Sequence, residues 1–179
     1  MTIADIKQTV KYYVEAATKA VKECGFDYVE IHGAHGYLVD SFFQDSANHR
    51  TDQYGGSIEN KARLALEIID GCIEAVCSEH VAIIISPYAV FQGSEGIHAR
   101  LNPIVMWGYL LSELQNRADD GKPLAYISVV EPRISGTDEN LEVENVDMSW
   151  IQKIWKGVVI TAGNYLNERY IDKLPSVVN

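Results

Sequence analysis

Residues 81–86, Val-Ala-Ile-Ile-Ile-Ser, form a continuous apolar run that ends at Pro87. A run without polar alternation is typical of a parallel strand that is buried on both faces. Parallel neighbours start at the same end of a sheet, so each pair needs a crossover connection, which is usually a helix. The run therefore predicts an α/β fold in which further strands alternate with helices.

The sequence on both sides of this run alternates in that way. Apolar residues recur at helical spacing in four segments, which we expect to form helices: residues 2–24, 57–76, 102–118 and 150–155. Short apolar runs predict three more strands: residues 26–32, 124–130 and 158–161. A polar loop is expected over residues 138–147, and one more helix could begin at Asn167. This order implies a parallel sheet with right-handed crossovers, and such sheets carry their chemistry at the carboxyl ends of the strands.

A polar, glycine-bearing stretch over residues 32–56 predicts a long loop, and long loops in compact domains are often functional. Arg50 and Asp52 could pair and hold this loop in place. Gly55 and Gly56 would then permit the tight turn into the following helix. At the N-terminus, Thr2 and the acidic residue three positions later resemble a capping box.

Composition limits the classes of function. A length of 179 residues predicts one domain, and the net charge of -10 argues against nucleic acid and anionic membranes as partners. No apolar run approaches the length of a transmembrane helix, and the N-terminus lacks the pattern of a secretory signal. The three cysteines fit a reducing compartment such as the cytoplasm, with Cys72 and Cys77 expected as small buried groups in a helix.

The densest group of chemically active residues is Glu30-Ile-His-Gly-Ala-His-Gly-Tyr37. His32 and His35 follow a predicted strand and could converge on one ligand oxygen, and Tyr37 adds a phenol that can donate a proton. Two alternatives stay open. The pair could be loop histidines, one of them bonded to backbone, or it could bind a divalent metal, although no third ligand stands nearby and metal sites usually need three or four.

Five segments, in this order, resemble the old yellow enzyme family: residues 29–38, 48–57, 86–91, 130–133 and 155–164. The last three look most like the fungal branch, and the resemblance covers nearly the whole chain. It implies a TIM (β/α)8 barrel, of which this chain would supply four βα units resembling strands 4–7, as a single partial-barrel domain over residues 1–179. In that family FMN lies across the barrel mouth. NADPH or NADH reduces it, and the flavin passes hydride to an activated alkene such as an α,β-unsaturated carbonyl.

The resemblance also implies roles for individual residues. His32 and His35 would hydrogen-bond the substrate carbonyl and so make the β-carbon a better hydride acceptor, and Tyr37 would protonate the α-carbon. Phe91 resembles an aromatic residue of the pocket wall, although a plain core position suits it equally well. Gly163 and Asn164 match the turn whose backbone amides hold the FMN phosphate.

Three departures from the family pattern concern the flavin. Ile84 stands where the family has an arginine against the flavin, and segments corresponding to the first three strands and to the eighth are absent. A half barrel should expose an apolar inner face, which would aggregate, associate or bind a partner. The leading hypothesis is an FMN-dependent NAD(P)H oxidoreductase of the ene-reductase type whose isolated chain lacks much of the FMN site. The alternative is a noncatalytic remnant, or a half-barrel module that pairs with a second copy or a complementing chain.

Overall fold

The computed structural model describes residues 1–136, 138–139, 143 and 146–168. The helices are α1 (Ile3–Thr18), α2 (Leu38–Phe43), α3 (Ile58–Val76), α4 (Pro103–Asp119) and α5 (Trp150–Ile154). The strands are β1 (Val29–Gly33), β2 (Val81–Ile85), β3 (Tyr126–Val130), β4 (Ile134–Ser135), β5 (Asp138–Glu139) and β6 (Val159–Ala162). Short helical turns are η1 (Lys19–Glu23), η2 (Ser78–His80), η3 (Phe91–Gly93) and η4 (Gly96–His98).

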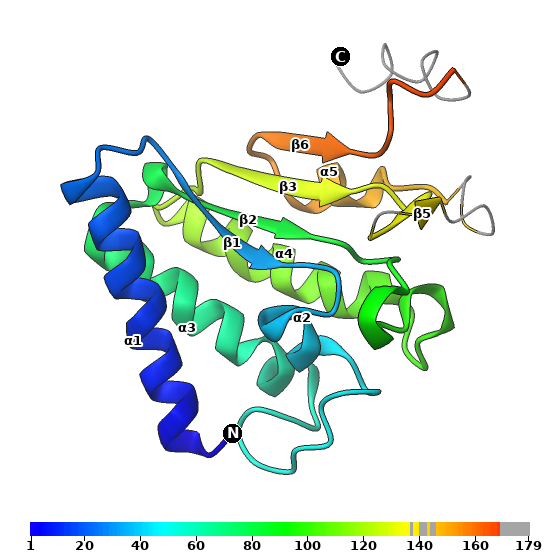
Figure 1. The fold of residues 1–179 in the computed structure, drawn as a ribbon, viewed down its shortest axis with the longest axis horizontal. Helices are drawn as coiled ribbons and strands as arrows, with labels where there is room; N and C mark the ends of the chain where they lie inside the picture. The colour runs from blue at the N-terminus through cyan, green and yellow to red at the C-terminus, as the bar shows by residue number, and fades with distance from the viewer. Residues whose placement is uncertain (137, 140–142, 144–145, 169–179) are drawn as a thin grey trace.

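Four strands form one parallel sheet in the order β1-β2-β3-β6 (Figure 1). The chain therefore has the α/β architecture of a partial barrel, as predicted. The register aligns one row of side chains across the sheet: His32, Ile84, Ser128 and Ile160. Because successive side chains of a strand point to opposite faces, this whole row lies on one face.

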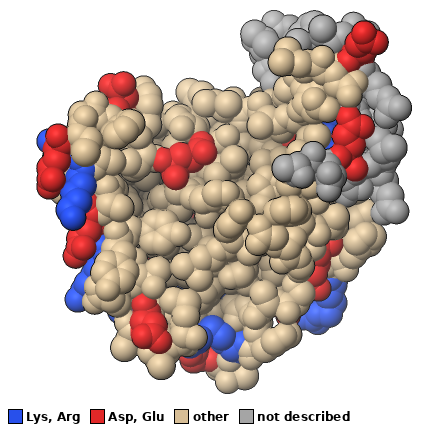
Figure 2. Space-filling model, viewed as in Figure 1, with Lys and Arg blue, Asp and Glu red and all other residues tan. Residues whose placement is uncertain are grey.

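Helices cover one face of the sheet and leave the other face open. Helices α3 and α4 lie behind the sheet in Figure 1, and their apolar side chains pack with the buried strand residues Ile31, Ile83 and Val129. On the opposite, open face Glu30 and His32 are exposed, as is Ile160 on the edge strand. This face was expected to be apolar and is mixed instead. Figure 2 shows only a few charged side chains over its middle.

The predicted start of the first helix is confirmed. The Thr2 amide donates to Asp5 Oδ2 at 2.7 Å, and the Asp5 amide donates back to Thr2 Oγ1 at 3.1 Å. This reciprocal pair is a capping box, which satisfies amides that have no partner inside the helix. The helix continues through the π-helical turn η1, and Gly25 follows it with a φ of 75°.

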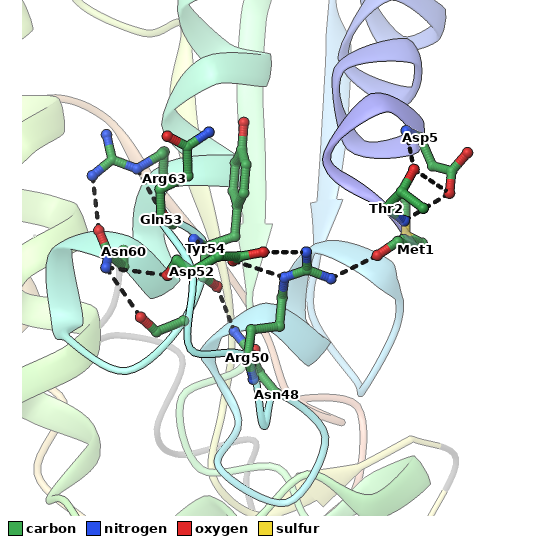
Figure 3. A network of polar contacts seen from close by, with 11 residues as sticks. Met1, Thr2, Asp5, Asn48, Arg50, Asp52, Gln53, Tyr54, Asn60 and Arg63 are labelled. Atoms are coloured by element: carbon green, nitrogen blue, oxygen red, sulfur yellow. Dashed lines mark hydrogen bonds and ion pairs between the residues drawn. The ribbon is translucent and has the colours of Figure 1, made fainter.

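The loop before α3 is held by a network of polar contacts around Arg50 (Figure 3). Its guanidinium donates twice to Asp52, at 3.0 and 2.5 Å, and once to the Met1 carbonyl at 2.7 Å. A Cβ at Gly55 would overlap the Arg50 carbonyl, and Gly56 has a φ of 82°. The structural role expected for this stretch is therefore confirmed, and the contact with Met1 also ties the loop to the start of α1.

Three sequence expectations were wrong. Residues 32–56 are not all loop, because α2 buries Val39, Phe42 and Phe43 at helical spacing between the polar flanks. The polar loop expected over 138–147 begins with a strand, since β5 pairs antiparallel with β4.

The third wrong expectation concerns Cys77. It is exposed rather than buried, and it ends α3 with a φ of 71°. Cys72 is buried as expected. Most of the final helix expected from Asn167 lies outside the described residues. Within the part of the chain that the structure describes, no helix is both long and apolar enough to cross a membrane.

Candidate active site at the carboxyl ends of the strands

The parallel sheet brings the carboxyl ends of β1, β2, β3 and β6 to one edge. The loop that follows β1 carries His35 and Tyr37, and we call residues 32–37 the donor loop. Ser86 directly follows β2, Glu131 follows β3, and the turn at residues 163–164 follows β6. The residues predicted to form a site therefore lie along this edge, with β1 and β6 at its two ends.

The two histidines of the donor loop lie near one another. Their ring centroids are 6.4 Å apart, with an interplanar angle of 71°. His35 has a φ of 57°, and its backbone amide donates to Ser86 Oγ at 2.8 Å. The end of β2 thus fixes the position of His35. Since a hydrogen bond spans about 3 Å, an oxygen atom between the rings could accept one from each.

Backbone contacts determine which ring nitrogen of each histidine can donate. The Ala34 amide donates to His32 Nδ1 at 3.3 Å, and the Gly136 amide donates to His35 Nδ1 at 3.4 Å. A neutral imidazole whose Nδ1 accepts a hydrogen bond carries its proton on Nε2. Burial lowers the pKa of His35, and electrostatic repulsion from His32 lowers it further, which favours the neutral His35 ring. The arrangement therefore leaves Nε2–H groups as donors.

Two aromatic side chains stand beside the histidines. The Tyr37 ring lies 4.7 Å from the His32 ring, and the residue is 50% exposed. The Phe91 ring meets the His35 ring edge to face at 6.1 Å. Phe91 also packs on Gly136, where an added Cβ would overlap its ring. Phe91 therefore forms part of the wall behind His35, and Tyr37 lies on the open side of the donor loop.

Sequence reasoning did not predict which contacts fix the donor loop from outside it. Gly136 reaches His35 from the β4–β5 hairpin, and Ser86 reaches it from the end of β2. Asp40, fully buried on α2, accepts a hydrogen bond from the Gly36 amide. The only signal for Asp40 was a carboxylate among apolar residues at helical spacing, and it was hidden because residues 32–56 were assigned to loop.

The turn after β6 has a different character. The Gly163 carbonyl accepts from Arg133 Nε at 2.6 Å, and a Cβ at Gly163 would lie 2.5 Å from the Glu131 side chain. The Asn164 side-chain amide donates to Glu139 at 2.9 Å. Glu131 also pairs with the Arg133 guanidinium at 3.2 Å. The carboxylates of Glu131 and Glu139 thus lie beside the turn and offset the positive charge of Arg133.

The described residues do not by themselves fit FMN. The carboxylates of Glu131 and Glu139 would repel a phosphate bound at the turn. In the row of side chains on the open face of the sheet, Ile84 lies between His32 and Ser128. An apolar side chain there cannot stabilise negative charge on a flavin. Among the described residues, no group of three or more His, Cys, Asp or Glu side chains could hold a metal ion.

Comparison with known proteins identifies the family. The model of the NADH:flavin oxidoreductase / NADH oxidase family matches residues 1–174. The chain belongs to this family. It is 47% identical over 168 residues to the "Probable NADPH dehydrogenase" of Candida albicans, covering 92% of this chain and 40% of that protein. It is 40% identical over 180 residues to "Enoate reductase 1" of Kluyveromyces lactis, covering 92% of this chain and 42% of that one.

A solved structure confirms the resemblance to the old yellow enzymes. The Old Yellow Enzyme from Pichia sp. AKU4542 is 54% identical with a TM-score of 0.91, covering 100% of this chain and 43% of that one. The family binds FMN and uses NADPH or NADH as reductant. The chain spans about two fifths of the length of the curated relatives described above.

Proposed function

We propose that this chain, a single partial-barrel domain over residues 1–179, provides the carbonyl-binding part of an FMN-dependent NAD(P)H oxidoreductase of the ene-reductase type. The observation that carries the proposal is the pair of backbone amides at His32 Nδ1 and His35 Nδ1, which leaves both Nε2–H groups as donors. The names of the relatives, NADPH dehydrogenase and enoate reductase, support the same reaction class.

The donor loop suits an α,β-unsaturated carbonyl substrate. Hydrogen bonds from His32 and His35 to the carbonyl oxygen withdraw electron density, which makes the β-carbon more electrophilic. A reduced flavin, held by a whole enzyme and regenerated by NADPH or NADH, would supply the hydride to the β-carbon. Tyr37 then gives its phenolic proton to the α-carbon, and solvent can return a proton because Tyr37 is half exposed. The product is the saturated carbonyl compound.

An NMR titration tests the role of the histidines without requiring turnover. We expect 2-cyclohexenone to shift the Nε2 signals of His32 and His35 in the 15N-labelled chain. His32→Gln and His35→Gln should each weaken binding by about tenfold, which corresponds to the loss of one hydrogen bond of about 1.4 kcal/mol. His49→Gln, at an exposed position outside the donor loop, is the matched control. Unshifted histidine signals at saturating enone would reject the proposal.

The cofactor contact that we propose is the turn of Gly163 and Asn164, against the FMN phosphate. The carboxylates beside this turn and the apolar Ile84 predict weak binding by the isolated chain. Titration with FMN, followed by quenching of flavin fluorescence, measures this affinity. Protein that retains no flavin after desalting would agree with a site that needs the rest of a barrel.

A second candidate function is that of a half-barrel module that associates through its open face. It is supported by exposed apolar side chains at both ends of the sheet, where Tyr28 is 54%, Val158 59% and Ile160 47% exposed. Either a second copy or a complementing chain could cover them. Sedimentation at micromolar concentration decides this, because a monomer throughout would rule out obligate self-association.

We also propose a cytoplasmic location, in keeping with the three free cysteines.

A further inference from the structure

A buried carboxylate lies beneath the donor loop. Asp40 stands in the first turn of α2, and the residue is 0% exposed. Burying an ionised carboxylate costs free energy unless hydrogen-bond donors replace the lost water. Burial raises the pKa of Asp40, while hydrogen bonds from its neighbours lower it. Such a group is retained only where its contacts compensate for that cost.

The contacts of Asp40 come from three separate parts of the chain. The Gly36 amide donates to Oδ2 at 2.6 Å, and Ser94 Oγ donates to the same oxygen at 2.9 Å. Gln44 Nε2 donates to Oδ1 at 3.0 Å. Hydrogen bonds to a charged acceptor are about twice as strong as neutral ones. One carboxylate therefore joins the donor loop, α2 and the segment after η3.

The contact with Gly36 acts at the middle of the donor loop. Gly36 has a φ of 73° and follows His35 at 57°, so two successive residues are left-handed. A Cβ at Gly36 would lie 2.9 Å from the Phe91 carbonyl oxygen, which shows how closely the loop approaches η3. Because an L-residue such as His35 adopts this conformation at a cost, it persists only where the surroundings enforce it.

The other two contacts fix the segment against which the donor loop rests. Ser94 ends η3, whose first residue is Phe91, the ring beside His35. Gln44 Oε1 in turn accepts from the Glu95 amide at 3.1 Å. Asp40 thus sets the distance between the loop that carries the donors and the segment that carries the aromatic wall.

We propose that Asp40 is a positioning residue that holds the imidazole of His35 and the phenol of Tyr37 in register with Phe91. The inference rests on the proposed function, since positioning concerns the groups that would bind the carbonyl. It predicts that loss of the carboxylate disturbs the His35 ring, although Asp40 reaches the donor loop through the Gly36 amide. Without its hold on Gly36, the donor loop relaxes and His35 Nδ1 loses the hydrogen bond from the Gly136 amide.

The experiment compares imidazole nitrogen signals in the 15N-labelled 179-residue chain and its variants. In Asp40→Ala we expect the two His35 nitrogen signals to move toward each other, because both tautomers become populated once Nδ1 is free. Enone affinity should fall by about tenfold, as expected when one of two donors is misaligned. Asp40→Asn keeps an acceptor of the same size for Gly36, so it should restore most of the wild-type pattern.

Asp52→Asn is the matched control. Asp52 also accepts several hydrogen bonds, but it lies in the segment between α2 and α3 and accepts them from Arg50 and the Tyr54 amide. The control should lower the unfolding midpoint while leaving the His35 signals in place. If Asp40→Ala does not fold, Ser94→Ala decides instead: it removes one donor to Oδ2 and should move the signals in the same direction by a smaller amount.

Wild-type His35 signals in a folded Asp40→Ala variant, or in Ser94→Ala when the former does not fold, would overturn the inference. Equal displacement by Asp52→Asn would do so too, because it would show general loosening. Failure of the proposed function has a separate signature: enone would leave the wild-type histidine signals unshifted, whatever Asp40→Ala does to them.

Discussion

The loop after β1 and the turn after β6 end parallel strands at the same edge of one sheet, but they are held in different ways. The donor loop is held by hydrogen bonds to neutral groups and to one buried carboxylate: Ser86 Oγ and Asp40 accept from its backbone amides, and the Gly136 amide donates to His35 Nδ1. The turn at Gly163 depends on Arg133, whose charge is offset by Glu131. The contacts that hold the donor loop thus come from this chain alone, whereas the turn after β6 has carboxylates on both sides that oppose a bound phosphate.

The largest expected effect comes from Gly136→Ala, which should break the support behind His35. Gly136 has a φ of 65°, and an added Cβ would overlap the Phe91 ring. We expect the free energy of unfolding to fall by about 2–3 kcal/mol, from strain and overpacking together, with displaced His35 signals. Urea unfolding and imidazole NMR measure the two effects. Gly121→Ala, with a φ of 81° and no atoms within 4 Å, is the control for strain alone.

Gly163→Ala should have a smaller effect, restricted to the other end of the site. Its Cβ would meet the flexible side chains of Glu131 and Arg133, at 2.5 and 2.9 Å, rather than a ring. A loss of about 1–2 kcal/mol in the free energy of unfolding is expected, because these side chains can move in part. His35 signals should stay in place. Displaced His35 signals would show that the donor loop and the turn after β6 are coupled, which would contradict their separate support.

Ile84→Arg should strengthen the binding of FMN without affecting the donor loop. It introduces a cation beside His32 in the row of side chains on the open face, at the position where the resemblance implies an arginine. We expect FMN affinity to rise by about tenfold, the effect of one hydrogen bond to a charged group. Ile160→Arg, in the same row but on the edge strand β6, is the matched control. Equal gains in both variants would indicate nonspecific attraction of the phosphate rather than a site.

The smallest effect concerns pH. The folded state lowers the pKa of His35, so the folded chain binds fewer protons there than the unfolded chain. This contribution to stability is present above the unfolded pKa of about 6.5 and is lost as the pH falls through the folded value. Urea midpoints at pH 7.5 and 5.5 should therefore differ less in His35→Gln than in wild type. An identical pH dependence would place the proton uptake elsewhere.

The helices and strands with a clear pattern of apolar residues could be predicted from the sequence. The apolar run at 81–85 and the helical spacing of 58–76 gave their strand and helix within a residue or two. Short elements could not be predicted in the same way. Helix α2 has six residues, and β4 and β5 have two each, so their patterns are too short to distinguish them from loop, and tertiary contacts stabilise them.

The sequence by itself determined the family and the order of strands and helices, and it predicted His32, His35 and Tyr37 as donors, because motifs and periods are local properties of the chain. Only the tertiary structure decided which nitrogen of each ring donates and which residues hold the donor loop. His35 Nδ1 meets the amide of Gly136, and Asp40 meets Ser94, residues far away along the chain. Such pairs form only when the parallel sheet brings the ends of its strands together, so no local pattern could have shown them.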